Sequence, residues 1–175
     1  MFDTPPQNIY WCYSEYKDAY RDLDPAIQLM EGLPSMKLIR ASKDIPKLII
    51  LDDLMEQFKA RPELTQLFTK YSHHNSLSVI FLVQNLFYEG LRTARLNCKY
   101  ICLFKNPGDR LHIQNLAKQM FPQKSKFLVD AFNDATEGQY GYLFLDLHPE
   151  TPEKQRYCTN IFPLEMTVYY VPVQS

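Results

Sequence analysis

Two apolar runs that end on polar side chains place the strongest constraint on how this chain folds. Residues 47–53 read Lys-Leu-Ile-Ile-Leu-Asp-Asp, so a continuous apolar run ends on Asp52 and Asp53. A second run, residues 77–83, ends on Gln84. Apolar runs without alternation are typical of strands that are buried on both faces. Because the carboxyl ends of parallel strands meet at one edge of a sheet, we expect the three polar side chains to lie together.

Further strands are predicted on both sides of this pair from β-branched and aromatic residues. The strongest are Ile9–Ser14, Tyr100–Phe104 and Tyr140–Leu147. Shorter edge strands are predicted at Met36–Ile39, Cys158–Phe162 and Thr167–Val171.

Helices are predicted where apolar residues recur at helical spacing. They are Ala26–Glu31 between Pro25 and Gly32, Leu54–Tyr71 with a break near Pro62, Arg110–Met120 with Asp109 as N-cap, and Lys126–Ala135. Residues 86–97 fit a short helix or an irregular connection. Strands and helices alternate as far as about Ala135, which favours the α/β class with a mostly parallel sheet flanked by helices. The runs at 9–14, 48–51, 77–83 and 100–104 are expected to be parallel, and residues 140–175 to form a β-rich end.

Composition favours one packed domain over 1–175, with an extended N-terminal segment at 1–8. The chain has 175 residues, of which 46% are hydrophobic, and a formal net charge of −1. This charge gives no bulk signature of nucleic-acid or membrane binding. No apolar run approaches the roughly 20 residues of a membrane span, and the N-terminus lacks signal-peptide features. We therefore expect a soluble, intracellular protein in the cytoplasm or nucleus. Its four cysteines form no C-x-x-C pair and are expected to be free thiols.

An apolar strand that ends on two carboxylates is how P-loop NTPases build the Walker B site. The first carboxylate holds Mg²⁺, and the second orients or deprotonates the attacking water. A polar residue at the end of the next strand can sense the γ-phosphate or position that water. The same pattern also suits a helix N-cap with a solvated neighbour, and it does not by itself decide between the two.

Residues 47–55 and 67–85 together resemble the viral DNA-packaging ATPases of the HerA/FtsK superfamily, chiefly the poxvirus-type enzymes and their relatives in Polinton-like and adintovirus-like elements. The likeness continues through residues 100–109 and 140–149. It implies a RecA/FtsK-like P-loop core that uses ATP and Mg²⁺, assembles as a homo-oligomeric ring and moves double-stranded DNA. Such a protein can also accompany the virion.

The resemblance also implies roles for single residues. Asp52 matches the Mg²⁺-associated carboxylate. Asp53 matches the catalytic carboxylate, which is often Glu in the wider superfamily. Gln84 matches the polar sensor. Arg92 and Arg95, which follow the sensor strand, are candidates for the arginine finger, with a solvated surface arginine as the alternative for each.

The chain departs from the family in its phosphate-binding loop. It has five glycines, and no two have the spacing of G-x-x-x-x-G-K-[ST], so no Walker A motif is present. The chain is therefore expected to be the part of the core downstream of the P-loop and to be inactive alone. One alternative is a catalytically silent module of the same fold that serves oligomerisation or nucleic-acid binding. Another is a metal-dependent hydrolase that uses Asp52 and Asp53.

Two other groups of residues have a candidate role in DNA contact. Basic residues of the C-terminal half could follow a phosphate backbone, or they could be ordinary solvent-facing side chains. They are Lys99, Lys105, Arg110, Lys118, Lys124 and Lys126. His73 and His74 could face DNA, or they could be exposed loop residues without the further ligands that a metal needs.

Overall fold

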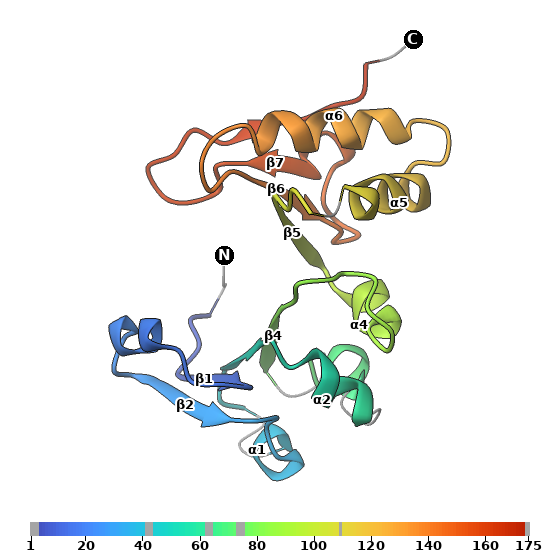
Figure 1. Ribbon diagram of the computed structural model, residues 1–175. Coiled ribbons are helices and arrows are strands. Elements are labelled where there is room, and N and C mark those ends of the chain that lie inside the picture. Colours follow the sequence, from blue (N-terminus) through green and yellow to red (C-terminus); the bar gives the residue numbers. More distant parts are fainter. Residues whose placement is uncertain (1–3, 41–43, 62–64, 73–75, 109, 174–175) are drawn as a thin grey trace. The chain divides into compact units, whose positions relative to one another are not determined.

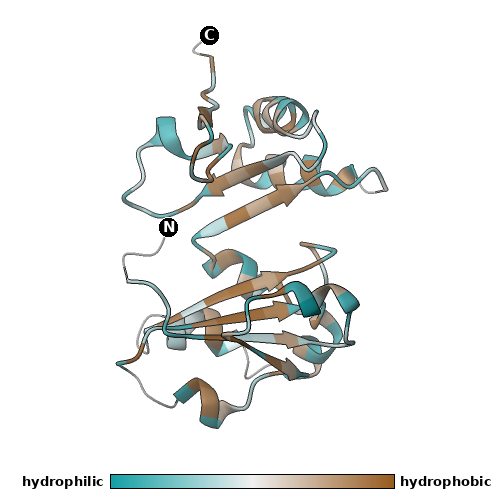
Figure 2. Ribbon diagram, turned by 90° about the vertical axis from the view of Figure 1, so that its left-hand side faces the viewer, coloured by the Kyte–Doolittle hydropathy of each residue, from teal (hydrophilic) through white to brown (hydrophobic). Residues whose placement is uncertain are grey.

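The computed structural model describes residues 4–40, 44–61, 65–72, 76–108 and 110–173. It divides the chain into two compact units, Met1–Asn97 and Cys98–Ser175, and each unit has its own four-stranded sheet (Figure 1). The strands carry much of the hydrophobic sequence in both units (Figure 2). The fold is therefore α/β, with one parallel and one antiparallel sheet.

The first unit is built on a parallel sheet with the strand order β2-β1-β3-β4. Its strands are β1 (Asn8–Tyr13), β2 (Ile27–Glu31), β3 (Lys47–Asp52) and β4 (Leu77–Leu82). β3 pairs with a strand on each side, and all six of its residues are buried. This burial on both faces explains why the apolar run of β3 does not alternate, and it confirms the predicted central strand.

Short helical segments connect these strands. They are η1 (Asp18–Asp22), α1 (Met36–Arg40), α2 (Met55–Ala60), the π-helical turn η3 (Leu67–Tyr71) and α4 (Arg92–Asn97). α1, α2, η3 and α4 contribute to the core on one face of the sheet, whereas η1 packs against Trp11 and Tyr13 on the other face. Phe58 of α2 is 1% exposed. Its ring centroid lies 6.0 Å from that of Phe68 in η3 and 5.2 Å from that of Phe81 in β4. This aromatic contact joins the helical layer to the sheet.

The second unit is an antiparallel sheet in the order β5-β6-β7-β8, with helices packed on one face. Its elements are β5 (Tyr100–Phe104), α5 (Leu111–Met120), α6 (Ser125–Ala135), β6 (Tyr142–Asp146), η4 (Glu153–Gln155), β7 (Tyr157–Thr159) and β8 (Val168–Tyr169). The two longer helices confirm the predictions at 110–120 and 126–135. The β-rich end at 140–175 is also confirmed, and Asp109 lies outside the described residues.

Two of the shorter elements were assigned wrongly from the sequence. Residues 27–31 form strand β2 instead of a helix, because they pair along their whole length with β1. Tertiary pairing here outweighs the local helix signal of Pro25 and Gly32. Residues 36–40 form helix α1 instead of an edge strand. The hydroxyl of Ser35 accepts a hydrogen bond from the Leu38 amide at 3.2 Å, which is an N-cap contact.

The prediction that β5 is parallel to the first three strands is also wrong. β5 pairs antiparallel with β6 in the second sheet. Its residues alternate between exposed and buried, with Ile101 and Leu103 facing inward. The outward residues Tyr100 and Phe104 are aromatic, so the sequence looks like a run buried on both faces although one face is open.

The turn between α6 and β6 gives the first testable prediction. A Cβ added at Gly141 would lie 2.5 Å from the Ala135 carbonyl oxygen and 2.9 Å from the Thr136 Cα, whereas one added at Gly138 would meet nothing within 4 Å. We expect Gly141→Ala to destabilise the protein by about 1–3 kcal/mol through overpacking. The matched control Gly138→Ala should change stability by less than about 0.5 kcal/mol. Urea denaturation followed by far-UV circular dichroism measures both, and equal values for the two variants would contradict the packing described.

Candidate functional site

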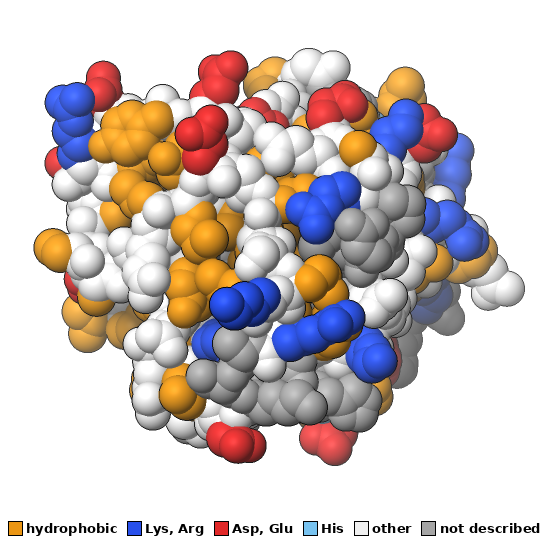
Figure 3. Space-filling model, turned by 90° about the horizontal axis from the view of Figure 1, so that it is seen from below, with side chains coloured by type: hydrophobic (Ala, Val, Ile, Leu, Met, Phe, Trp, Pro, Cys, Tyr) orange, Lys and Arg blue, Asp and Glu red, His pale blue; other side chains and the backbone are white. Residues whose placement is uncertain are grey.

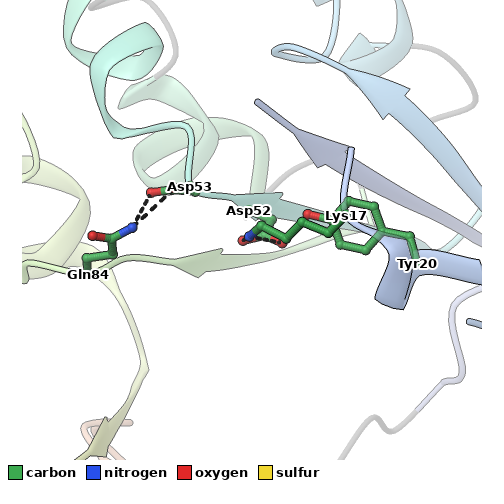
Figure 4. Close-up of polar contacts among 5 residues, drawn as sticks. All are labelled: Lys17, Tyr20, Asp52, Asp53 and Gln84. Atoms are coloured by element: carbon green, nitrogen blue, oxygen red, sulfur yellow. Dashed lines mark hydrogen bonds and ion pairs between the residues drawn. The ribbon is translucent and has the colours of Figure 1, made fainter. Parts of the chain in front are cut away.

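Polar side chains gather at the carboxyl edge of the parallel sheet in the first unit. The strand register places Tyr13 of β1, Asp52 of β3 and Leu82 of β4 side by side. Residues that follow each of these positions therefore emerge at the same edge. Figure 4 shows the outcome: two groups of contacts, one around Asp53 and one around Asp52.

The first group joins Asp53 to Gln84, as the sequence predicts. The Gln84 Nε2 donates to both carboxylate oxygens of Asp53, at 3.1 and 3.2 Å. The Asp53 amide also donates to the Leu82 carbonyl at 3.3 Å, which extends the link between β3 and β4 by one residue. A carboxylate and an amide are thus held together at the ends of two neighbouring strands.

The backbone of Asp53 has the left-handed conformation, with φ at 56°. Few residues other than glycine adopt this region, and Asp and Asn are among those that do so most often. The conformation ends β3 and turns the chain toward α2. It also directs the Asp53 side chain toward Gln84, while Asp52 points toward the other group of contacts (Figure 4). Residues of this kind are concentrated at functional sites.

The second group surrounds Asp52, which is 9% exposed. The Tyr20 hydroxyl donates to Asp52 Oδ2 at 2.6 Å. The Lys17 Nζ lies 3.3 Å from each of the two carboxylate oxygens. Tyr20 belongs to η1 and Lys17 immediately precedes it, so the segment that follows β1 supplies both partners. Asp52 is therefore a buried carboxylate whose charge is balanced by an ammonium group of the same chain.

The Asp52 carboxylate shifts the titration of both partners. Burial favours the neutral form of Lys17, but the hydrogen bond and the charge of Asp52 outweigh it and raise the pKa of Lys17. Burial and then the hydrogen bond to Asp52 raise the pKa of Tyr20. At neutral pH, Lys17 is thus a cation and Tyr20 a hydrogen-bond donor.

Aromatic rings hold η1 in place beside this carboxylate. The Tyr20 ring lies 5.6 Å from Trp11, 5.3 Å from Tyr13 and 5.6 Å from Tyr16, measured between centroids. Tyr20 is 6% exposed. Its position is therefore fixed by packing as well as by the hydrogen bond to Asp52.

The two arginines proposed as fingers lie on α4. Arg92 is the first residue of that helix and is exposed. The Arg95 guanidinium stacks on Phe87, with Cζ 4.4 Å from the ring centroid, which is a cation–π contact. The contact with Phe87 holds the Arg95 side chain against the segment between β4 and α4. Arg92 is therefore the more accessible of the two arginines.

Sequence reasoning missed Lys17 and Tyr20. The short polar stretch 15–22 fits a turn or a helical piece, and η1 lies within it, but the sequence predicts no role for its side chains. A signal was present, because the segment that follows a parallel strand next to β3 must begin at the same edge of the sheet as Asp52. Identifying it required knowing that β1 pairs directly with β3, which the sequence does not state.

Of the side chains in this group, only the Asp52 carboxylate could be a ligand of a divalent cation, because Lys17 and Tyr20 act as donors to it. Mg²⁺ is usually bound by one or two carboxylates together with substrate oxygens, and Lys17 shows that this carboxylate attracts a cation in the structure. In the parts of the chain that the structure describes, no cluster of three or more His, Cys, Asp or Glu side chains could hold a metal by itself. The protein could therefore supply only part of a coordination shell here.

Basic residues also form a surface on the helical layer of the first unit. Lys37, Arg40 and Lys70 are exposed, and no ion pair with a described carboxylate involves them. Arg40 Nε and Nη2 donate to the Tyr71 hydroxyl at 3.2 and 3.0 Å, and Lys70 Nζ lies 5.9 Å from the same ring. Figure 3 shows a face on which Lys and Arg side chains lie near one another, with most Asp and Glu toward its rim. Tyr71 thus brings two cations together.

The basic residues predicted in the C-terminal half are all on the surface of the second unit. Each is exposed: one lies on α5, one on α6, and the other four on connections that flank β5 and the helices. They are Lys99, Lys105, Arg110, Lys118, Lys124 and Lys126. His73 and His74 lie outside the described residues.

Comparison with known proteins finds no matching family model, curated protein or solved structure. Among the helices of the described residues, none combines the length and apolar character required to cross a bilayer.

The left-handed backbone at Asp53 gives a second prediction. Asp53→Ala should destabilise the protein by about 1 kcal/mol or more, because alanine tolerates this conformation poorly. Asp53→Asn should cost less, since asparagine tolerates it and still accepts a bond from Gln84. Gln84→Ala removes only the exposed hydrogen bond and serves as the control. Urea denaturation gives the three values, and an Asp53→Ala variant as stable as Asp53→Asn would contradict the argument.

The raised pKa values of Lys17 and Tyr20 give a third prediction. Both groups bind their protons more tightly in the folded state, so their contribution is complete below the unfolded values of about 10 and is lost as pH rises through the folded ones. Wild type should therefore lose more thermal stability between pH 8 and pH 11 than a Lys17→Met/Tyr20→Phe variant. Melting curves at the two pH values test this, and equal losses would show that the Asp52 contacts do not contribute.

Proposed function

We propose that this chain is the catalytic half of a packaging-type ATPase core, in which ATP hydrolysis drives the movement of double-stranded DNA through a homo-oligomeric ring. The observation that supports this proposal is the contact between Asp53 and Gln84 at the carboxyl ends of two adjacent parallel strands. In a P-loop core of the RecA/FtsK type, this is where the catalytic carboxylate and the sensor meet. The motifs on which the resemblance rests lie on the same two strands.

Each residue has a distinct part in the proposed reaction. Asp53 accepts a hydrogen bond from the attacking water and orients it or takes its proton. Gln84 fixes the Asp53 carboxylate and can report contact with the γ-phosphate. Asp52 would hold Mg²⁺, which neutralises charge on the phosphate oxygens when it is bound. Arg92 is the candidate for a finger that reaches a neighbouring subunit, and the exposed basic residues of both units are candidates for DNA contact.

The proposed reaction needs a phosphate-binding loop that these 175 residues do not supply, because they contain no G-x-x-x-x-G-K-[ST] motif. Without such a loop, no backbone cradle or P-loop lysine binds the β-phosphate. We therefore propose that hydrolysis requires a second polypeptide segment that supplies this loop.

A silent module of the same fold is the second candidate function. Two observations favour it: Lys17 already balances the charge of Asp52, and Lys37, Arg40 and Lys70 form a basic surface away from that carboxylate. In this case the chain would bind nucleic acid or promote assembly without turning over ATP. The Asp-based hydrolase is less well supported, because Asp52 and Asp53 point to different partners.

A kinetic experiment tests the proposal and gives a fourth prediction. DNA-stimulated ATP hydrolysis is measured for the purified chain alone and with the polypeptide that is encoded immediately upstream of it. Hydrolysis should appear only with that polypeptide. Asp53→Asn should then lower kcat by about 10²–10⁴, the usual contribution of a general base, with little change in KM.

Asp44→Asn provides the matched control, because Asp44 is an exposed carboxylate that precedes β3 and lies outside the site. It should leave kcat unchanged. If the upstream polypeptide has no effect, or if Asp53→Asn hydrolyses ATP as fast as wild type, the ATPase proposal fails. DNA binding without hydrolysis would then favour the silent module.

A further inference from the structure

We infer that the Lys17 ammonium occupies the position at the Asp52 carboxylate that a divalent metal would take. A metal would therefore bind this carboxylate only by displacing Lys17. The inference rests on the proposed function, which assigns a metal to Asp52. It adds a residue that controls access to the metal, and no part of the resemblance assigns a role to that residue.

The geometry places the Lys17 ammonium where a bound cation would be. Its Nζ lies 3.3 Å from each oxygen of the Asp52 carboxylate and so bridges them. Tyr20 already donates to Oδ2, so the bridging ammonium covers the remaining accessible side of the carboxylate. A second positive charge could not share this position with Lys17, because like charges a few ångströms apart repel strongly in a partly buried site.

Lys17 is held loosely enough to be displaced. Its side chain is 51% exposed, whereas that of Asp52 is 12% exposed. Both Nζ–oxygen distances are longer than the 2.7–2.9 Å of a strong charge-assisted bond. An ion pair with one exposed partner contributes little to stability, so the lysine can leave at small cost. A divalent cation in the same position would again balance the charge of the buried carboxylate.

Tyr20 remains in place when Lys17 leaves. It is buried among Trp11, Tyr13 and Tyr16, and its 2.6 Å hydrogen bond keeps the Asp52 carboxylate in one orientation. Lys17 and Tyr20 therefore have separate roles. Lys17 occupies the position that a cation would take, and Tyr20 orients the Asp52 carboxylate.

Trp11 provides a direct readout of metal at Asp52. It is the single tryptophan of the chain, and its ring lies 5.6 Å from that of Tyr20, which binds the carboxylate. Tb³⁺ takes the same oxygen ligands as other hard cations, and it emits when a nearby tryptophan is excited. Titration of the 175-residue chain with Tb³⁺ thus reports binding at this place without nucleotide or activity.

The experiment compares four proteins in Tb³⁺ titrations, each with Mg²⁺ added at the end to displace the probe. Lys17→Met should bind Tb³⁺ at least tenfold more tightly than wild type, because the competing charge is gone while the apolar stem remains. Lys17→Arg keeps the charge and should bind like wild type. Asp52→Asn should lose the sensitised emission. Lys17→Gln serves as a second neutral variant if Lys17→Met does not fold, as judged by circular dichroism.

The outcomes separate this inference from the proposed function. Equal Tb³⁺ affinity of wild type and Lys17→Met, with loss in Asp52→Asn, overturns the competition by Lys17 and leaves the metal site standing. Absence of binding in every protein overturns both the competition and the assignment of a metal to Asp52. Emission that survives in Asp52→Asn means that Tb³⁺ binds elsewhere, and this also overturns the inference.

Discussion

The pairing of β3 with a parallel strand on each side is the constraint on which the first unit depends. It buries all six residues of β3 and sets Tyr13, Asp52 and Leu82 at one level. Side chains alternate along a strand, so a slip of one residue would turn the apolar residues of β3 to the opposite face. The same register determines which polar groups meet beyond the strand ends, so the core and the candidate site share one origin.

Two adjacent carboxylates serve different partners because the strand ends between them. Asp52 is still part of β3, and its side chain meets the segment that follows β1. Asp53 has left the strand in a left-handed conformation and meets Gln84 beyond β4. Two neighbouring negative charges would repel each other, and the Lys17 ammonium relieves that repulsion on the buried side. The edge of the sheet thus separates a charge-balanced carboxylate from one that is open to solvent.

The sequence was most informative where local pattern and tertiary environment agree. The continuous runs predicted strands β3 and β4, and their polar ends predicted the meeting of Asp53 and Gln84. Only β3 is the buried central strand that its run indicated, because β4 lies at the edge of the sheet and exposes Ile80 and Leu82. Helical spacing predicted α5 and α6. The failures came where pairing with a distant strand decides the structure, as for β2, or where exposed aromatic residues imitate burial, as for β5. Lys17 could not be identified because its contact with Asp52 spans 35 residues. That contact depends on the pairing of β1 with β3, which the sequence does not show.

The left-handed backbone at Asp53 restricts which residues can replace aspartate at this position. A side chain one methylene longer, as in glutamate, lacks the short local polar contacts that make the left-handed region accessible to Asp and Asn. Exchange of Asp53 for glutamate would therefore require a change in the conformation of the turn. The conformation of this one turn thus favours aspartate over glutamate at position 53, independently of any catalytic role.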